Sequence, residues 1–258
     1  MPEPVHRLPD FIIGGAPRSG TTWLYLLAQR HPQLAMAEPM VPEPKFFLVD
    51  ELWQRGGDYY STNWFDSLPA NRLLGEKSTN YLESAEAPER MYRTVPRVKL
   101  VFLLRNPIDR AYSNYLWSRQ NGLESLTFER ALAREERRER GLAADLRYAR
   151  PHAYFSRGLY AEHLARFFDR FPREQILVLR HEDVAMFPER VAANFHRFLG
   201  VAELPETAFA LGRINAAETA RRESLSPSIR RRLAHRYRTA NANLAILLPD
   251  FALWSDDW

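Results

Sequence analysis

A short glycine-containing loop near the N-terminus has the residue types of an anion-binding site. Residues 11–14 form an apolar, β-rich run, and a loop with glycines at Gly15 and Gly20 follows it. From Thr21 onward, apolar residues recur at helical spacing. A strand–loop–helix connection directs several backbone N–H groups, and the positive end of the helix dipole, at one point. The sequence therefore predicts a phosphate or sulfate site at this loop.

The loop differs from the nucleotide-binding P-loop at one position. That P-loop has the pattern Gly-x-x-x-x-Gly-Lys-Ser/Thr, and its lysine reaches the β- and γ-phosphates. Gly15 and Gly20 have the required separation, but Thr21 occupies the lysine position and the cation lies within the loop as Arg18. A P-loop kinase of a small molecule would lack this lysine, so it is our second hypothesis. A turn that binds no ligand is the structural alternative for this segment.

Charged residues in three later segments are further candidates for chemistry. Glu43 lies in an apolar, proline-bounded loop, where the pKa of a carboxyl can rise enough for proton abstraction near neutral pH, although on chemistry alone a surface glutamate without a catalytic role is the favoured interpretation. Lys77 is one of only three lysines, with Lys45 and Lys99, so a compact ammonium is indicated at that point. Arg105 ends a strongly apolar run, which is where open α/β sheets place their ligands.

These residues require a frame of alternating strands and helices. Asn106 and Pro107 suit the N-cap and first position of a helix after Arg105. Such alternation implies a mostly parallel sheet covered on both faces, and we expect one domain over residues 1–258 with residues 1–10 flexible. Strands are predicted near residues 11–13, 33–37, 98–104 and 175–180, residues 73–82 are predicted as a short strand that runs into a polar loop, and later helices are predicted over 158–171, 188–199 and 227–247.

Three groups of residues are interpreted as structural. The aromatic-rich residues 50–65 are assigned to packing, in preference to the lining of an acceptor cleft. The charged run 134–140 is interpreted as a solvated helix face with i,i+4 ion pairs. His163, His181 and His196 have no metal-ligand spacing, so they too are assigned to structure.

Composition excludes several classes of protein. With no cysteine, the chain has no disulfide framework, thiolate metal site or cysteine nucleophile. Residues 1–10 lack an apolar signal core and no apolar run reaches transmembrane length, so we expect a soluble, cytoplasmic protein without a membrane span. The net charge of +4 suits an anionic cosubstrate. Nucleic-acid binding is disfavoured because no zinc-finger, RNP or helix-turn-helix pattern is present.

Several segments in order resemble sulfotransferases that use 3′-phosphoadenosine 5′-phosphosulfate (PAPS). Residues 17–24 (Pro-Arg-Ser-Gly-Thr-Thr-Trp-Leu) are similar to the 5′-phosphosulfate loop of that family. Residues 43–47, 76–81 and 105–113 resemble segments of the heparan-sulfate N- and O-sulfotransferase branch and its bacterial relatives. The resemblance extends, with gaps, from Phe11 to about Leu248. It implies a three-layer α/β fold like that of P-loop NTPases.

The resemblance also implies an activity. The sulfuryl group of PAPS would pass in line to a hydroxyl or amine of an acceptor, leaving adenosine 3′,5′-bisphosphate (PAP). A glycan, a glycolipid or a secondary metabolite is the expected acceptor, and the oligomeric state is open. No metal is expected, because a magnesium-dependent NTPase would have an aspartate where Arg105 follows the strand. A non-catalytic nucleotide-binding module is the third hypothesis, disfavoured by the separate matching segments at Glu43, Lys77 and Arg105.

Residue roles follow from the resemblance by position. Glu43 is implied as the general base, Lys77 as the cation that approaches the sulfate, and Lys45 as a group that orients the acceptor. The phosphosulfate loop would use Arg18, Ser19, Gly20, Thr21 and Thr22; Arg105 and Ser113 would bind the 3′-phosphate; Tyr160, Arg221 and Arg222 are further cofactor-binding candidates.

The chain departs from the family pattern at two positions. Arg18 stands where relatives often have lysine, and arginine is a poor proton donor, so its service to the bridging oxygen is open. Leu48 stands where several relatives have an acidic residue. That auxiliary role therefore has no candidate here.

Overall fold

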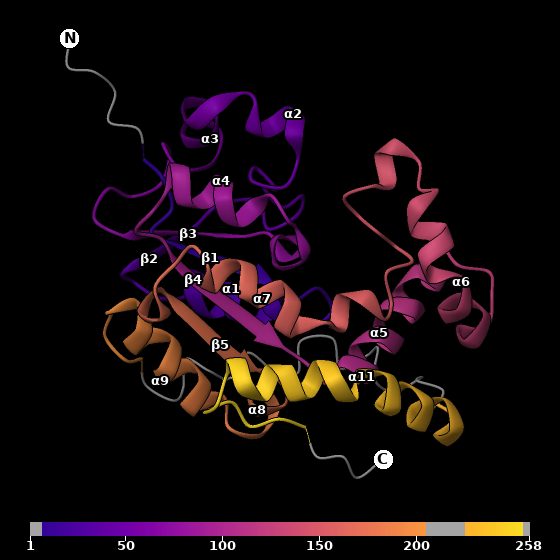
Figure 1. The fold of residues 1–258 in the computed structure, drawn as a ribbon. Coiled ribbons are helices and arrows are strands. Elements are labelled where there is room, and N and C mark those ends of the chain that lie inside the picture. The colour runs from indigo at the N-terminus through magenta and orange to yellow at the C-terminus, as the bar shows by residue number, and fades with distance from the viewer. Residues whose placement is uncertain (1–6, 205–224, 255–258) are drawn as a thin grey trace.

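A parallel sheet lies at the centre of the molecule. The structure is a computed structural model that describes residues 7–204 and 225–254. In these ranges five strands pair in the order β2-β3-β1-β4-β5, and every pair is parallel (Figure 1). The predicted strands are confirmed as β1 (Phe11–Gly15), β2 (Leu34–Met36), β3 (Leu73–Lys77), β4 (Lys99–Leu104) and β5 (Ile176–Arg180).

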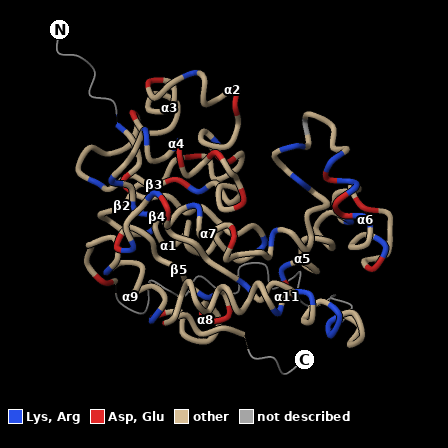
Figure 2. Tube along the Cα trace, viewed as in Figure 1, with Lys and Arg blue, Asp and Glu red and all other residues tan. Residues whose placement is uncertain are grey.

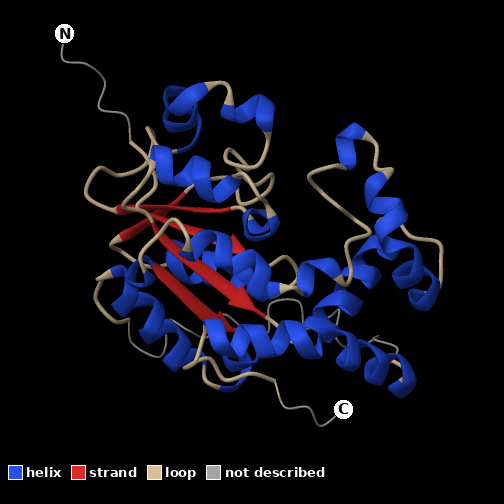
Figure 3. Cartoon of the chain, viewed as in Figure 1, coloured by secondary structure: helices blue, strands red, loops and turns tan. Residues whose placement is uncertain are grey.

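Helices cover both faces of this sheet, so the predicted three-layer α/β fold is confirmed (Figure 3). Buried residues of α4 and α7 pack with Ile12 on one face, and those of α1 and α9 pack with Phe11 and Ile13 on the other. The helices are α1 (Thr21–Gln29), α2 (Asp50–Trp53), α3 (Gly56–Trp64), α4 (Ala87–Thr94), α5 (Pro107–Gln120), α6 (Phe128–Arg140), α7 (Tyr160–Phe168), α8 (His181–Met186), α9 (Pro188–Leu199) and α11 (Pro227–Leu247). Short 3-10 turns are η1 (Thr79–Glu83), η2 (Ala144–Leu146), η3 (Ser156–Gly158) and η4 (Arg173–Gln175).

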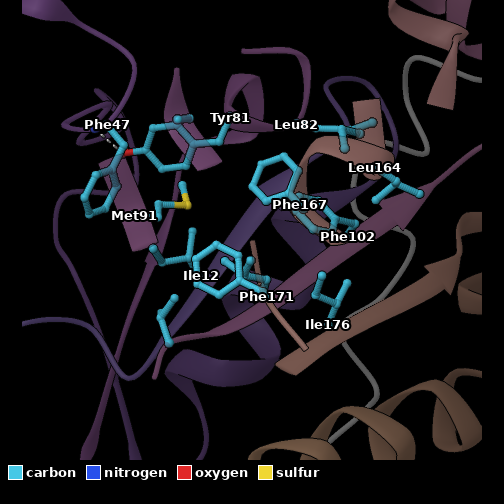
Figure 4. Packing of buried hydrophobic residues seen from close by; sticks show 14 of the residues in the cluster. Ile12, Phe47, Tyr81, Leu82, Met91, Phe102, Leu164, Phe167, Phe171 and Ile176 are labelled. Atoms are coloured by element: carbon cyan, nitrogen blue, oxygen red, sulfur yellow. Dashed lines mark hydrogen bonds between the residues drawn. The ribbon is translucent and has the colours of Figure 1, made fainter. Parts of the chain in front are cut away.

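Burial on both faces explains why the central strands are continuous apolar runs. Parallel strands between two helical layers have no face toward solvent, so polar and apolar residues do not alternate along them. Phe102 of β4 packs edge-on against Phe167 of α7 with ring centroids 4.8 Å apart, and Ile12 of β1 lies in the same cluster (Figure 4). The neighbouring β4 residues Val101 and Leu103 belong to the cluster on the opposite face.

Local signals predicted the helix ends well. The side chain of Asn106 accepts hydrogen bonds from the backbone N–H groups of Ile108 (3.0 Å) and Asp109 (3.3 Å), and Pro107 begins α5. Gly200 ends α9 in the left-handed conformation, with φ of 81°. These caps fix where α5 and α9 start and stop relative to the sheet.

Residues 50–65 form the two short helices α2 and α3, and their aromatic side chains pack. The ring of Tyr60 stacks on Phe46 with centroids 4.2 Å apart and meets Phe65 edge-on. Tyr60 and Phe65 are buried, and Trp53 and Tyr59 pack against the same cluster. The packing interpretation is therefore supported, although the helices themselves were not predicted.

The charged run 134–140 lies on α6, where acidic and basic residues are interspersed (Figure 2). The prediction of a solvated face is wrong for Glu135, which is buried. Its carboxylate accepts hydrogen bonds from the backbone N–H groups of Phe155 (2.7 Å) and Ser156 (2.8 Å). Buried backbone donors need a partner, so Glu135 fixes the loop that precedes α7.

None of the helices in residues 7–204 and 225–254 is long and apolar enough to cross a membrane.

Candidate active site

The carboxyl ends of the parallel strands meet at one edge of the sheet, and the predicted site residues follow them. Residues 16–20 follow β1, Glu43 lies in the loop after β2, Lys77 ends β3 and Arg105 follows β4. The strand order changes direction between β1 and β4, since the chain passes from β1 to one side and later returns to the other. Open α/β sheets bind their ligands at such a switch point.

The loop after β1 has the features of an anion site. Gly20 is the N-cap of α1, with φ of 86° and no side-chain cap for the helix. A Cβ at Gly20 would lie 2.7 Å from Nδ1 of His181, so a side chain there would collide with α8. Ser19 Oγ is buried and has no hydrogen-bond partner in the described part of the chain. A buried hydroxyl beside an uncapped helix start fits a bound phosphate or sulfate group.

Arg18, Arg105 and Ser113 lie together. Arg18 Nε donates a hydrogen bond to Ser113 Oγ over 3.4 Å, and Arg105 Nη1 donates to the backbone oxygen of Arg18 over 3.2 Å. Arg18 adopts the left-handed conformation with φ of 66°. The loop after β1 and the strand–helix corner after β4 are therefore in direct contact, and Arg18, Arg105 and Ser113 form one cationic surface.

Tyr160 contacts the backbone of this surface at Arg105. Its hydroxyl donates a hydrogen bond to the backbone oxygen of Arg105 over 2.8 Å, and its side chain is buried. Burial raises the pKa of Tyr160 to about 12, so the phenol stays protonated and keeps donating. The contact shown is with Arg105, and direct binding of the cofactor by Tyr160 stays a prediction.

Glu43 and Lys77 form an ion pair at the next position along the edge. The two side chains are only 13% and 6% exposed, so the pair is largely shielded from water. Glu43 also accepts hydrogen bonds from the backbone N–H of Thr79 (3.2 Å) and from its hydroxyl (3.2 Å). Two predicted catalytic residues, 34 positions apart in the sequence, are thus in direct contact.

Lys45 is fixed through its backbone. Its N–H donates a hydrogen bond to Ser78 Oγ over 2.9 Å, and it adopts φ of 51°. A lysine in the left-handed region is uncommon and needs support from its surroundings. Ser78 supplies that support, which fixes the loop two residues after Glu43. Orientation of the acceptor by the Lys45 ammonium stays a prediction.

A second ionic cluster is connected to the Glu43–Lys77 pair through η1. Glu83, at the end of η1, pairs with Arg157 Nε (2.7 Å) and Arg150 Nη1 (3.1 Å), and accepts from Asn80 Nδ2 (2.6 Å). Burial alone would raise the pKa of Glu83, but the two guanidinium groups outweigh it and lower the pKa to about 2. The cluster ties η1, which also carries Thr79, to the segment before α7.

Sequence analysis missed several residues of the site. Ser78 and Thr79 hold the loop that carries Glu43, and His181 approaches the loop at Gly20. Glu76 lies on β3 and is fully buried next to the pair. Burial raises its pKa to about 8, with a further contribution from the charge of Glu43. The available signal was a glutamate inside a strand that is otherwise buried, since such residues are rarely buried without a reason.

Two further predictions concern the cofactor-binding candidates Arg221 and Arg222 and the absence of a metal ion. Arg221 and Arg222 lie outside the described residues. Within residues 7–204 and 225–254, no group of three or more His, Asp or Glu side chains is placed to hold a metal ion.

Comparison with protein families and curated proteins identifies relatives of this chain. The model of the sulfotransferase domain matches residues 8–211. The human bifunctional heparan sulfate N-deacetylase/N-sulfotransferase 3 is 31% identical over 204 residues, which cover 76% of this chain and 22% of that protein. The N-deacetylase/N-sulfotransferase 1 of Xenopus laevis is 32% identical over 204 residues, with the same coverage. The chain thus spans about a fifth of the length of these curated relatives.

Solved structures show the same fold. The crystal structure of a sulfotransferase from Alicyclobacillus acidocaldarius superposes with a TM-score of 0.80 at 29% identity, covering 95% of this chain and 98% of that chain. A mouse sulfotransferase complexed with PAP superposes with a TM-score of 0.53 at 17% identity, covering 79% of this chain and 62% of that chain. At that level of identity the mouse protein shows the fold alone.

Proposed function

Because the chain belongs to the sulfotransferase family, we propose that the carboxyl edge of its sheet transfers the sulfuryl group of PAPS to an amine or hydroxyl group of a sugar. The chain is a PAPS-dependent sulfotransferase by family. The observation that supports this site for the reaction is the shielded Glu43–Lys77 pair beside the cationic surface of Arg18, Arg105 and Ser113.

The cationic surface would hold the nucleotide at its two anionic ends. The first-turn N–H groups of α1 and the hydroxyl of Ser19 would bind the 5′-phosphosulfate. Arg105 and Ser113 would bind the 3′-phosphate, and Arg18 lies between these two regions. Arginine suits this position because its planar guanidinium donates to two oxygens at once.

Glu43 would act as the general base, and Lys77 would stabilise the charge of the transferring sulfuryl group. Glu43 takes the proton from the attacking amine or hydroxyl group, as the sulfur–acceptor bond forms and the bond from sulfur to the bridging phosphate oxygen breaks. Lys77 neutralises charge on the transferring group, which its ammonium can reach when it turns from Glu43. Thr79 keeps Glu43 in place through two hydrogen bonds while this happens.

The acceptor class is inferred from similarity. The curated relatives at 31–32% identity are named for heparan sulfate N-sulfation, which favours a glycan amine or hydroxyl. Transfer of labelled sulfate from PAPS would be compared for an N-desulfated heparan chain, a neutral amino sugar oligomer and a small phenol. Transfer to the phenol alone would contradict a glycan acceptor and leave the transferase reaction intact.

The variant Glu43→Gln tests the assignment of the base. Loss of a general base typically lowers kcat by about 10²–10⁴-fold, whereas PAP binding should stay within about twofold because the 3′ and 5′ anion sites are untouched. Glu38→Gln is a matched control, since Glu38 is exposed in the same loop. Near-normal turnover of a folded Glu43→Gln protein would remove Glu43 from this role.

A further inference from the structure

The carboxyl group of Glu76 is the strongest unassigned feature near the site. It lies on β3 directly before Lys77, with no exposed surface. A carboxylate buried without a cation is very costly, and such groups take up a proton instead. Lys77, the adjacent cation, is already paired with Glu43. The charge of Glu43 acts on Glu76 in the same direction as burial, so the neutral form of the Glu76 carboxyl is favoured.

Glu76 is connected to the loop that carries Glu43. Ser78 Oγ donates a hydrogen bond to Glu76 Oε2 over 3.4 Å and accepts one from the backbone N–H of Lys45 over 2.9 Å. Lys45 lies two residues from Glu43 and holds the left-handed conformation. The path from Glu76 through Ser78 thus ends on the backbone turn that sets the direction of Glu43.

Aromatic side chains close the space around this path. Tyr60 and Tyr81 are fully buried, and their hydroxyl groups adjoin the Glu76 carboxyl and oppose the rise in its pKa. The Tyr81 hydroxyl accepts a hydrogen bond from the backbone N–H of Phe47 over 3.3 Å (Figure 4). Tyr60 stacks on Phe46. Two further points of the base-bearing loop therefore rest on groups that adjoin Glu76.

We propose that Glu76 is a positioning residue for sulfuryl transfer, a buried neutral acid that acts through Ser78 and the two tyrosines to hold the Glu43 loop. This inference rests on the proposed function, because it assumes that Glu43 is the base. Ionisation of Glu76 would place a second negative charge near Glu43, whose own charge already disfavours it. It would also repel the anionic sulfuryl group that Lys77 must approach.

The first test compares Glu76→Gln, Glu76→Leu and wild type across pH. Glutamine keeps the shape and hydrogen bonds of the neutral acid, so kcat at pH 7 should stay within about threefold, while leucine should lose at least tenfold. Wild-type kcat should fall as the pH rises through about 8, the value to which burial raises the pKa of Glu76. Glu76→Gln should lack that fall, which a purely structural role would not produce.

Thermal unfolding gives a readout that does not depend on turnover. The folded pKa of Glu76 lies above its unfolded value, so the folded state binds more protons between pH 5 and 8. Wild type should therefore lose melting temperature relative to Glu76→Gln as the pH rises through this window. A constant difference in melting temperature would show that Glu76 is ionised throughout, and would overturn the proposal.

Ser78→Ala tests the connection itself, with Ser118→Ala as its matched control. Both serines are fully buried, and the Ser118 hydroxyl donates to the backbone oxygen of Pro151, away from Glu43. One hydrogen bond is worth about 0.5–1.5 kcal/mol, so Ser78→Ala should lower kcat about three- to tenfold with the KM for PAPS unchanged. Ser118→Ala should leave kcat unchanged, and equal losses in both variants would overturn the proposal.

Glu43→Gln, measured in parallel, separates the two possible failures. If Glu43→Gln is inactive while Glu76→Gln keeps the alkaline fall of wild type, the positioning role of Glu76 is wrong and the base assignment stands. If Glu43→Gln is active, the proposed base is wrong, and the positioning role falls with it.

Discussion

Glu76 and Glu83 show how far the charge of one residue type depends on its surroundings. Both are buried and lie seven positions apart, yet burial raises the pKa of Glu76 to about 8. Burial acts on Glu83 in the same direction, but Arg157 and Arg150 lower its pKa to about 2. Because the partners of Glu83 come from a segment more than 60 positions away, the sequence around the two glutamates does not distinguish them.

Arg105 is the residue on which cosubstrate choice should depend. A charge-assisted hydrogen bond contributes about 1.5–3 kcal/mol, so Arg105→Ala should weaken PAP binding by about 10–150-fold. Binding of adenosine 5′-monophosphate, which lacks the 3′-phosphate, should change much less. Ser113→Ala should show the same selectivity with a smaller effect.

Calorimetry with both nucleotides measures this selectivity directly. Arg97→Ala is the matched control, because Arg97 is exposed and precedes β4 at the opposite edge of the sheet. If Arg105→Ala weakened both nucleotides equally, Arg105 would act at the 5′ end or through structure alone.

The buried hydroxyl of Ser19 should lower the stability of the nucleotide-free protein and strengthen its binding of PAP. Its buried hydroxyl lacks a partner in the described part of the chain, and an unsatisfied buried polar group costs about 1–3 kcal/mol. Ser19→Ala should therefore leave the melting temperature of the nucleotide-free protein unchanged or higher, and should weaken PAP binding. Thermal shift with and without PAP measures both quantities, and a lower melting temperature without PAP would show that the hydroxyl is already satisfied.

At the scale of elements, the 3-10 turn η1 connects Glu43 to the ionic cluster of Glu83, Arg150 and Arg157. Thr79 at its start binds Glu43, and Glu83 at its end binds Arg157 and Arg150. The position of the Glu43 carboxylate therefore depends, through η1, on the two arginines that precede α7.

Glu83→Gln should destabilise the protein, because it leaves the buried guanidinium groups without their counter-charge. Breaking a buried pair typically costs about 3–5 kcal/mol. The folded pKa of Glu83, about 2, lies below its unfolded value, so its contribution is full above pH 5 and is lost as the pH falls toward 2. Urea unfolding at pH 7 and pH 3 would show a smaller loss for the variant at pH 3. An equal loss at both values would mean that folding does not lower the pKa of Glu83, so that the two arginines do not stabilise its charged form.

The strands were predictable and the site contacts were not, for physical reasons. The central strands β1 and β4 are apolar runs because they are buried on both faces, and the caps at Asn106 and Gly200 depend on neighbouring residues only. Helices α2 and α3 were missed because their aromatic residues follow no clear period and Gly56 and Gly57 interrupt them. The pairing of Glu43 with Lys77 requires the loop after β2 to fold back on β3, which local patterns do not specify.

At the scale of the whole molecule, α11 joins two parts of the core. Its residue Leu244 packs in the cluster over the sheet, while Leu233 and Tyr237 pack with α5 and α6 in a separate cluster. The Tyr237 hydroxyl donates to the backbone oxygen of Phe155 over 2.8 Å. The chain passes from Leu104 in the first cluster to Ile108 in the second, so the corner that carries Arg105 lies between two clusters that α11 joins.

The nucleotide should in turn stabilise the whole fold, and its identity separates a sulfotransferase from a kinase. A ligand at 100 times its Kd adds about 2.7 kcal/mol to the free energy of unfolding, so PAP should raise the melting temperature by several degrees. ATP with magnesium should do so far less, because Thr21 replaces the lysine that would reach a γ-phosphate and Arg105 replaces the aspartate that would help hold magnesium. Sulfuryl transfer should also survive EDTA, because the side chains of Arg18 and Lys77 supply the positive charge that a metal ion would otherwise supply. Thermal shift compares PAP with ATP–magnesium, with Arg105→Ala as the control for specific binding at the 3′ site, and a transfer assay with labelled PAPS, with and without EDTA, tests the third expectation. Selective stabilisation by ATP–magnesium, or loss of transfer in EDTA, would favour phosphoryl transfer at this edge of the sheet.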